Sequence, residues 1–465
     1  MPPSYYFRNL EMSLPERVKE LQWRKLKWQL DYVYHRIPFY RNLCEQNKIR
    51  PEKIDSFQAF YDRWPIISKA DLIKDQEANP PWGSRWALSL EQAVQTHLTS
   101  GTTGQGQEVY LSNFEDLEYL GSCWAAHLYW AGIRKGDLVA NLWPLATMAA
   151  SLSMAQGLIK LGANPLHIAI FDAHTKLAKY LCRFPVKYLV TVPAYLTRLA
   201  YLCRELSVEP KRDMPHLQGI IISTEAYPVA WAQAAQEFWG AKIFESYGLT
   251  QQGAALAGSC EGGVVPEGRR GALHLVEYYT LVEVVDRHSL KPADSGEEGE
   301  PIITTLERKG APLIRFRTED KVVFLSHKEC PCGRPFNAFQ AGTIARYDDM
   351  MKVKGVNIWP QAVDEVVLTR PEIEEYNGRL FLTEQGQEVA EVRLAFKTER
   401  DLSREEKARA TEQVSKELKS KTGINMVVKE VKLEELERFE FKPRRWTDLR
   451  KVGLERVKFV ERAHD

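Results

Sequence analysis

The sequence predicts an α/β protein: a large N-terminal domain of helix-covered, mostly parallel sheets, then a small α+β domain. The first indication is an alternation of short apolar runs of strand length with helical segments between residues 109 and 223. The second is a change to strand-like segments after Gly271, and the third is a new set of helices and strands beyond residue 345. Because strands buried on both faces read as continuous apolar runs, the alternation favours a parallel sheet covered by helices.

Length and composition fit an ordinary globular protein. The 465 residues suffice for two or three domains, and 44% of them are hydrophobic and 27% charged. A formal net charge of +1 gives no electrostatic reason to expect nucleic acid or an acidic membrane surface. We find neither a long apolar run nor a signal peptide, and seven cysteines argue against a disulfide framework. We therefore expect a cytoplasmic protein without a membrane anchor.

The N-terminal part is predicted to be helical. Helical periodicity runs through residues 14–48, with Ile37 and Pro38 ending the helix, and a second helix is expected near 54–63. Ser68 is a plausible N-cap for a helix that starts at Lys69. Further on, we expect helices over 114–132, 149–161, 175–183 and 194–206, and strands over 138–142, 164–170, 188–193 and 219–223.

A hydroxyl- and glycine-rich turn stands before a short strand at 109–111. The turn comprises Ser100, Gly101, Thr102, Thr103 and Gly104. Glycines let the backbone approach a ligand while N–H and O–H groups donate, which suits a phosphate. A P-loop would need Lys and Ser or Thr where Gln107 and Glu108 stand, and the third glycine of a dinucleotide fingerprint is absent. A hydrophilic hairpin turn remains the alternative.

Two further segments follow strands of the predicted sheet. Residues 223–226 lie at the carboxyl end of one strand, where ligands collect in such sheets and where a helix N-cap would fit equally well. Residues 243–253 read as a strand that enters a loop bounded by glycines. Strands over 273–276, 280–285, 300–306 and 313–316 then form a β-rich subdomain of about residues 271–344.

The C-terminal region starts with a polar turn at 345–360. Beyond it we expect helices over 361–368 and 404–422 and strands over 379–382, 391–396 and 425–431. These make an α+β domain of roughly 110 residues. The basic segment 438–445 reads either as a solvated tail or as a functional motif.

Five segments together resemble the adenylate-forming acyl-CoA ligase superfamily, most closely the phenylacetate–CoA ligases and coenzyme F390 synthetases. They are Thr99–Gly104, Glu245–Thr250 (E-S-Y-G-L-T), Pro312–Asp320 (P-L-I-R-F-R-T-E-D), Arg346–Pro360 (R-Y-D-D-M…G-V-N-I-W-P) and Arg438–Arg445 (R-F-E-F-K-P-R-R). Each motif alone is weak, but five in family order over most of the chain are specific.

The resemblance implies an ATP-dependent ligase. A carboxylate, expected to be an aromatic one like phenylacetate in this branch, would attack the α-phosphate of ATP, and coenzyme A would then displace AMP. Residues 1–345 would hold the adenylate and residues 346–465 would form a mobile lid that rotates about Asp348. Lys442 and Thr250 would be the catalytic residues, because phosphoryl transfer is stabilised by positioned charges and donors.

The resemblance also implies the nucleotide-binding residues. They are Ser100, Gly101, Thr102, Thr103 and Gly104 for the phosphates; Ser223, Thr224, Glu225, Ala226, Glu245, Ser246, Tyr247 and Gly248 around adenine; Asp320 for the ribose; and Arg346 near ribose and phosphate. ATP, Mg²⁺ and coenzyme A would be the cofactors, the carboxylic acid the small-molecule partner, and a homodimer stays open.

Three positions depart from the family pattern. Gln251 stands where relatives have a glutamate that holds Mg²⁺, Gln105 stands where the loop has a lysine, and Phe441 replaces the glycine before Lys442. A neutral amide binds a hard cation less well than a carboxylate does. Two alternatives therefore stay open: transfer of the acyl group to an amine or a carrier-protein thiol, and a catalytically weak nucleotide-binding homologue.

A structural zinc site is the last expectation from the resemblance. Some relatives bind zinc through a cysteine, a histidine and a C-x-C pair, and Cys260, His274, Cys330 and Cys332 would supply that set here. Unpaired cytosolic thiols and a strand histidine are the alternative. Cys44, Cys123, Cys182 and Cys203 lie in apolar helical patterns and are expected in the core.

Overall fold

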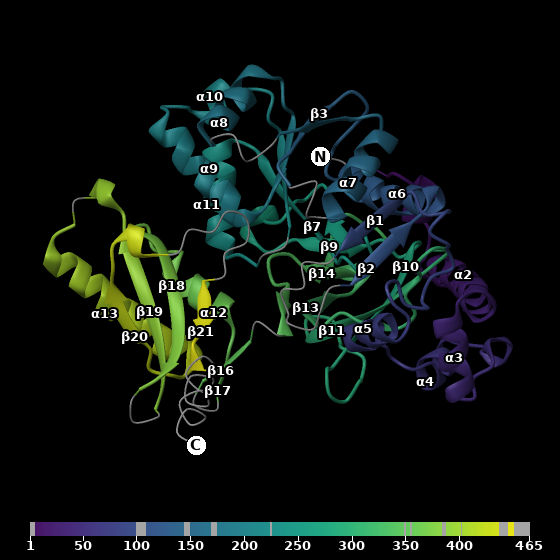
Figure 1. Ribbon diagram of the computed structural model, residues 1–465. Coiled ribbons are helices and arrows are strands. Elements are labelled where there is room, and N and C mark those ends of the chain that lie inside the picture. Colours follow the sequence, from purple (N-terminus) through teal and green to yellow (C-terminus); the bar gives the residue numbers. More distant parts are fainter. Residues whose placement is uncertain are drawn as a thin grey trace. The chain divides into compact units, whose positions relative to one another are not determined.

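A computed structural model of the chain describes residues 5–98, 108–143, 149–168, 174–223, 226–347, 350–353, 356–383, 387–400, 402–436 and 445–450 (Figure 1). The chain divides into two compact units. The large unit contains residues 1–225 and 235–344, and the small unit contains residues 226–234 and 345–465. Helix α11 (Val229–Trp239) crosses this division in the sequence.

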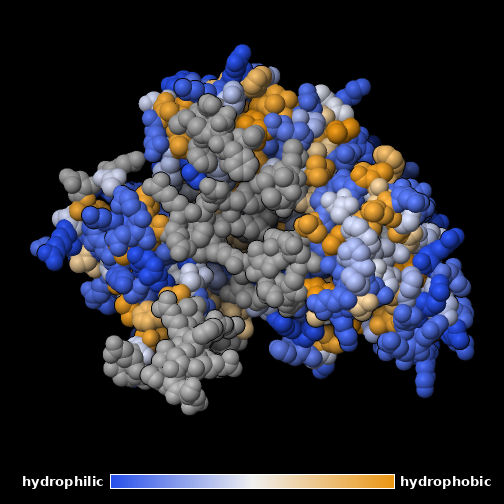
Figure 2. Space-filling model, viewed as in Figure 1, coloured by the Kyte–Doolittle hydropathy of each residue, from blue (hydrophilic) through white to orange (hydrophobic). Residues whose placement is uncertain are grey.

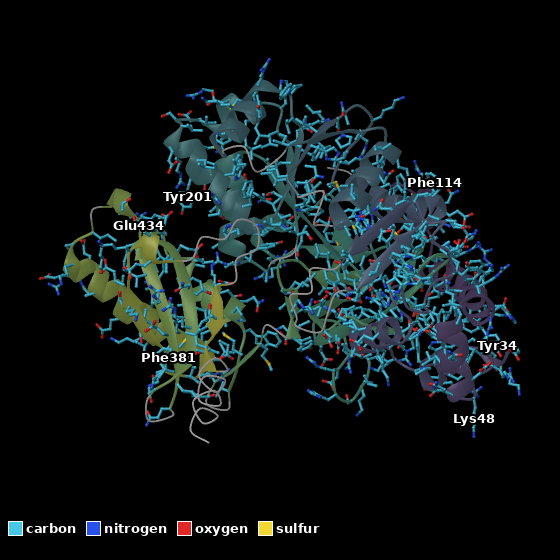
Figure 3. All side chains as sticks on the ribbon, viewed as in Figure 1. Tyr34, Lys48, Phe114, Tyr201, Phe381 and Glu434 are labelled. Atoms are coloured by element: carbon cyan, nitrogen blue, oxygen red, sulfur yellow. The ribbon has the colours of Figure 1, made fainter. Side chains whose placement is uncertain are left out.

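The N-terminal helices are α1 (Arg8–Glu11), α2 (Pro15–Arg36), α3 (Pro38–Gln46), α4 (Phe57–Arg63) and α5 (Lys69–Ala78). Pro38 ends the first long helix as predicted, but it also begins α3, because proline at a first helical position loses no intrahelical hydrogen bond. Ser68 caps α5 through a reciprocal capping box with Asp71, which confirms the predicted N-cap. Figure 3 labels Tyr34 on α2 and Lys48 beyond α3 at this end of the large unit.

One extended sheet forms the centre of the large unit. Its strands follow the order β10-β11-β13-β14-β9-β8-β7-β6-β5-β3-β4. Their bounds are β3 (Leu138–Asn141), β4 (Asn164–His167), β5 (Tyr188–Thr191), β6 (Gly219–Ile222), β7 (Lys242–Gly248), β8 (Ala255–Ser259), β9 (Ala272–Leu275), β10 (Thr280–Val285), β11 (Glu298–Thr305), β13 (Asp320–Leu325) and β14 (Ala338–Gln340). Strand β12 (Phe316–Arg317) pairs with β11.

The pairing changes from parallel to antiparallel at β7. Strands β4, β3, β5, β6 and β7 are parallel neighbours, and β7 pairs antiparallel with β8. The strands that were expected in a β-rich subdomain appended to the α/β core continue the same sheet. Apolar strands such as β5 and β6 are buried along their whole length, which explains why they read as continuous hydrophobic runs.

The next helices of the large unit precede or connect the parallel strands in sequence. They are α6 (Phe114–Trp130), α7 (Ala149–Lys160), α8 (His174–Arg183), α9 (Pro193–Glu205) and α10 (Pro210–Asp213). Helix α6 contacts α7 and β8, and its side chains are buried along most of its length. Phe114, labelled in Figure 3 at the start of α6, is 76% exposed, since the polar N-terminus of the helix reaches the surface.

A separate antiparallel pair carries the ends of the predicted phosphate turn. Strand β1 (Gln95–Leu98) pairs with β2 (Val109–Ser112), with Leu98 opposite Val109. The segment 99–107 therefore connects two paired strands, although it lies outside the described residues.

The small unit is an α+β domain. It contains a sheet of order β20-β19-β18-β21, with β18 (Ile373–Leu382) and β19 (Glu388–Phe396) antiparallel and longer than the sequence predicted. Helix α12 (Pro360–Val367) contacts α13 (Arg404–Thr422), and side chains of both helices join the sheet in one hydrophobic core. The remaining strands are β15 (Ala345–Arg346), β16 (Met351–Val353), β17 (Val356–Ile358), β20 (Val427–Glu430) and β21 (Trp446–Asp448).

The predicted fold class is confirmed: a large mixed α/β sheet unit is followed by a small α+β unit. The view in Figure 2 shows polar and apolar residues intermingled over the coloured surface of the large unit. Among the described residues, no helix combines the length and the apolarity that crossing a bilayer requires.

Candidate functional site

Tyr247 and Asp320 are in contact, although β8, β9 and β14 separate their strands in the order of the sheet. Tyr247 is in β7, and its hydroxyl donates a hydrogen bond of 2.5 Å to Oδ2 of Asp320, the first residue of β13. Its ring also makes an edge contact with Phe339 on β14. The structure thus brings together two residues that the resemblance assigned to adenine and ribose, although 73 positions separate them in the sequence.

Other predicted residues of β7 are buried near this pair. Glu245 and Ser246 are each 4% exposed, and the carboxylate of Glu245 accepts a hydrogen bond from the backbone N–H of Gly342 at 2.8 Å. Ser223 lies directly after β6, whose partner strand is β7, so it shares the carboxyl edge of the parallel sheet. Gly248 ends β7, where a Cβ atom would lie 2.3 Å from the carbonyl oxygen of Ala254.

Several predicted residues cannot be compared with these positions. Ala226 and Arg346 belong to the small unit. Residues outside the described part of the chain are Ser100, Gly101, Thr102, Thr103, Gly104, Thr224, Glu225, Asp348 and Lys442. Their assigned roles stay predictions.

Glu108 is a buried carboxylate at the start of β2. It is 0% exposed, and the Tyr110 hydroxyl donates to its Oε1 at 2.6 Å. Its Oε2 accepts a hydrogen bond of 2.7 Å from Nε2 of Gln251 and lies 3.9 Å from the Lys69 ammonium group. The carboxylate therefore joins α5, β2 and the loop after β7 through one charged, hydrogen-bonded cluster.

Gln251 is fixed from two sides. Its side-chain N–H group donates to Glu108, and its backbone carbonyl accepts a hydrogen bond of 3.1 Å from Nη1 of Arg308. The same Arg308 nitrogen donates to the carbonyl of Gln252 at 2.6 Å. An acceptor-only carboxylate requires the nitrogen end of the amide to face it, so the side-chain oxygen of Gln251 is turned away from Glu108.

A small cavity of mixed polar and apolar lining lies next to this loop. It has a volume of about 10 Å³, and its walls include His97 on β1, Ser112 on β2, Ser153 on α7, Thr250 after β7, and Arg308. Burial lowers the pKa of His97, so its imidazole is neutral near pH 7. The cavity includes the predicted catalytic residue Thr250 together with groups that can donate or accept hydrogen bonds.

The sequence analysis did not identify Glu108 as the centre of a hydrogen-bonded cluster. It also did not identify Lys69, Tyr110 and Arg308 as residues of the site. A charged residue directly before the apolar strand Val109–Leu111 was a usable signal, because a carboxylate entering a buried strand needs partners. Nothing in the sequence indicates that the partners would be Lys69 and Gln251. Those contacts depend on tertiary packing.

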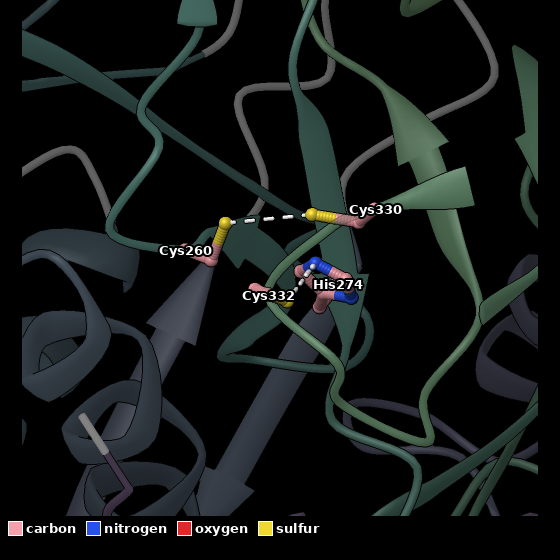
Figure 4. A group of neighbouring side chains, drawn as sticks. All are labelled: Cys260, His274, Cys330 and Cys332. Atoms are coloured by element: carbon pink, nitrogen blue, oxygen red, sulfur yellow. Dashed lines mark hydrogen bonds between the residues drawn. The ribbon is translucent and has the colours of Figure 1, made fainter. Parts of the chain in front are cut away.

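The four predicted zinc ligands converge in the antiparallel half of the sheet (Figure 4). Cys260 follows β8, His274 lies in β9, and Cys330 and Cys332 lie between β13 and β14. All four ligand atoms lie within 4.8 Å of one another. The three cysteines are free thiols in the structure.

The spacing of these atoms fits a tetrahedral metal. Sγ of Cys260 lies 3.7 Å from Sγ of Cys330, and Sγ of Cys332 lies 3.3 Å from Nε2 of His274. Two sulfurs bound to zinc at about 2.3 Å are about 3.8 Å apart in a tetrahedron. Hydrogen bonds from Cys260 and Cys330 also lower the pKa of Cys332, which favours the thiolate that a metal requires.

The surroundings of the cluster orient its ligands. Nδ1 of His274 lies 3.3 Å from the carbonyl oxygen of Phe336, so a proton on Nδ1 leaves Nε2 free to face the thiols. Arg334, two residues after Cys332, is 1% exposed and forms an ion pair of 2.6 Å with Glu261, next to Cys260. Residues adjoining the cysteines thus fix both loops.

Solved structures share the fold of this chain. A crystal structure of 2-hydroxyisobutyryl-CoA ligase in the postadenylation state, in complex with 2-HIB-AMP, superimposes with a TM-score of 0.86. The match covers 99% of this chain and 96% of the other at 22% identity. The fold is therefore that of adenylate-forming enzymes.

Sequence comparisons define the family. The AMP-binding enzyme family matches residues 39–305, and the AMP-binding enzyme C-terminal domain matches residues 355–450. The phenylacetate–coenzyme A ligase of Thermus thermophilus is 30% identical over 79% of each chain, and that of Escherichia coli is 26% identical over 95% of this chain and 97% of its own. The chain belongs to the AMP-binding enzyme family, and the predicted resemblance is confirmed.

Proposed function

We propose that this protein is an ATP-dependent, AMP-forming acid–thiol ligase. A substrate carboxylate oxygen attacks the α-phosphorus of ATP and pyrophosphate leaves. The sulfur of coenzyme A then attacks the acyl carbon, and AMP leaves with the electron pair of the broken C–O bond. The observation that carries the proposal is the match of family and fold over nearly the whole chain.

The described residues support a nucleotide site along the carboxyl edge of β7. Tyr247 and Asp320 would bind the adenosine, and Thr250 would donate to the α-phosphate. Lys442, on the predicted lid of residues 346–465, would stabilise negative charge during adenylation. Mg²⁺ would neutralise the phosphates, with the outward-facing amide oxygen of Gln251 as a neutral ligand in place of a carboxylate.

We also propose that Cys260, His274, Cys330 and Cys332 hold a structural zinc ion. Their donor atoms fill the tetrahedron that zinc prefers and leave no position for a substrate. A cytoplasmic location would keep the thiols reduced. The ion would fasten the loop after β8 to β9 and to the segment before β14.

Pyrophosphate release with a panel of aryl and alkyl acids, with and without coenzyme A, tests the ligase. We expect release with an aromatic acid of the phenylacetate type and a thioester when coenzyme A is present. Release without a thioester would favour transfer to an amine or carrier-protein thiol instead. No release with any acid, despite ATP binding, would indicate a weak nucleotide-binding homologue.

A further inference from the structure

Arg308 is a buried cation at the wall of the small cavity. The residue is 1% exposed, and its Nη1 donates to the carbonyls of Gln251 and Gln252. Its Nε is buried without a hydrogen-bond partner. Within the described part of the chain, no carboxylate lies within 4.0 Å of its guanidinium group. Some of the five N–H donors of the guanidinium group are thus available to the cavity.

Other buried arginines in the large unit are compensated. Arg315 pairs with Glu283 at 2.9 Å, and Arg334 pairs with Glu261. Arg85 has no ion pair among the described residues, but its guanidinium lies over the rings of Trp86 and Tyr110 at 5.1 and 5.3 Å. A buried cation is costly unless electronegative atoms surround it. Arg308 therefore has donor capacity that the described residues leave unused.

The rest of the cavity wall combines hydroxyl groups with the apolar residues Leu120 and Ala149. Ser112 is 3% exposed, and Ser153 already accepts a hydrogen bond of 2.9 Å from Nε1 of Trp124. Thr250 links the cavity to the proposed reaction site, because its hydroxyl is the one assigned to the α-phosphate. A volume of about 10 Å³ is that of one water molecule. The space next to Arg308 suits a single oxygen atom better than an unsubstituted ring.

We propose that the acid activated by this enzyme carries a hydroxyl or oxo oxygen, and that Arg308 recognises this oxygen in the cavity. The inference rests on the proposed ligase function and narrows its substrate class. An acid without the oxygen leaves the guanidinium buried and unpaired, so it binds more weakly. Sites that hydrogen-bond a substrate oxygen discriminate strongly against analogues that lack it.

Matched acids test the inference. We would measure kcat/KM for pyrophosphate release with phenylacetate, para-hydroxyphenylacetate, mandelate and phenylglyoxylate, and with isobutyrate and 2-hydroxyisobutyrate. At least one oxygen-bearing acid should exceed its parent by about tenfold or more. Equal values for every pair would overturn the inference while leaving the ligase function intact.

Variants separate recognition from structure. Arg308→Met keeps the bulk of the side chain without its donors, and Ser112→Ala removes a cavity hydroxyl at little cost in volume. Both variants should move the ratio of kcat/KM between the oxygen-bearing acid and its parent towards one. Arg85→Met, a buried arginine outside the cavity, is the control and should keep the ratio. Equal loss with both acids in Arg308→Met, or an unchanged ratio in both cavity variants, would contradict the proposal.

Failure of the proposed ligase function can be distinguished from failure of the inference about Arg308. If no acid releases pyrophosphate, the ligase function fails, and binding of the same acid pairs to the wild-type protein by saturation-transfer NMR still decides the inference. Stronger binding of the oxygen-bearing acid supports it. Equal binding of each pair overturns it.

Discussion

At the scale of single residues, the buried carboxylate of Glu108 changes how Gln251 must be understood. The sequence alone suggests that Gln251 weakens metal binding, because an amide replaces a metal-binding glutamate. In the structure it is the hydrogen-bond donor that a fully buried carboxylate needs. The contact joins residues 143 positions apart, so no local pattern could predict it. Motif matching found the position, but only packing shows its partner.

The single substitution Gln251→Glu should therefore lower stability rather than simply restore metal binding. It would place two carboxylates in hydrogen-bond contact, while the Lys69 ammonium group lies 3.9 Å from Glu108 and does not neutralise a second charge. We expect a loss of about 1–3 kcal/mol in the free energy of unfolding, measured by chemical denaturation.

The exchanged pair Glu108→Gln with Gln251→Glu is the matched control. It keeps one amide and one carboxylate in contact and moves the charge to position 251. Its stability should return towards that of the wild type, and a magnesium titration of pyrophosphate release would then show what a carboxylate at 251 contributes. Full stability of the single variant would refute the electrostatic argument.

Glu277 should make the stability of the large unit depend on pH. Burial raises the pKa of its carboxyl group to about 7 from 4.5, although Asn337 donates a hydrogen bond of 2.9 Å to it. Because the folded-state pKa lies above the unfolded value, its stabilising contribution is full below about pH 4.5 and is lost as pH rises through about 7.

The variant Glu277→Gln should remove this dependence. Between pH 5 and pH 8, the wild type should lose about 2–3 kcal/mol of unfolding free energy relative to the variant, because the pKa of the group falls from about 7 to 4.5 on unfolding. Denaturant titrations at both pH values measure the difference. Glu45→Gln, on an exposed position of α3, should follow the wild type. Parallel pH profiles of Glu277→Gln and wild type would show that the carboxyl group titrates normally.

At the scale of elements, local sequence signals predicted the helices and strands whose ends depend on local chemistry. Helix α13 has the predicted bounds, since Ser403 caps its start with Glu406 and Gly423 ends it at a φ of 78°. Pro38 was interpreted only as a helix end, because proline signals both an end and a beginning. Helix α11 was anticipated only through the possible N-cap at residues 223–226 and was given no bounds. Strands β18 and β19 extend further than their apolar segments suggested, because partner strands prolong the ladder.

Close packing of α6 on α7 depends on Gly157. A Cβ atom there would lie 2.5 Å from Cβ of Trp124 and 3.1 Å from the carbonyl oxygen of Gly121. Gly157→Ala should push the helices apart and cost about 1–3 kcal/mol in unfolding free energy, as overpacked cores do. Ile159→Ala, on the exposed side of α7, should change stability little. A stable Gly157→Ala protein would mean that the two helices separate without loss of packing.

At the scale of the whole molecule, the sequence did not predict the order of the strands in the sheet. Alternating helices and strands predicted the parallel half, and the strand-rich region after Gly271 was expected as a subdomain. The structure joins both into one sheet at the antiparallel contact of β7 with β8. Pairing between strands that are distant in the sequence depends on which strand edges are still unpaired. The hydrophobic periodicity of a segment does not indicate which edge it will pair with.

The proposed zinc ion would stabilise this junction, since Cys260 extends from β8 and His274 lies in β9. We expect one zinc per chain by elemental analysis. Its removal by a chelator, or the substitution Cys332→Ser, should lower the unfolding temperature of the large unit by several degrees, because metal-binding energy is released only in the folded state. The small unit contributes none of the four ligands, so its unfolding should not change. Cys203→Ser, at a buried cysteine outside the cluster, controls for loss of a thiol and should retain the metal. Zinc-free protein with an unchanged melting profile would assign the cluster to free thiols instead.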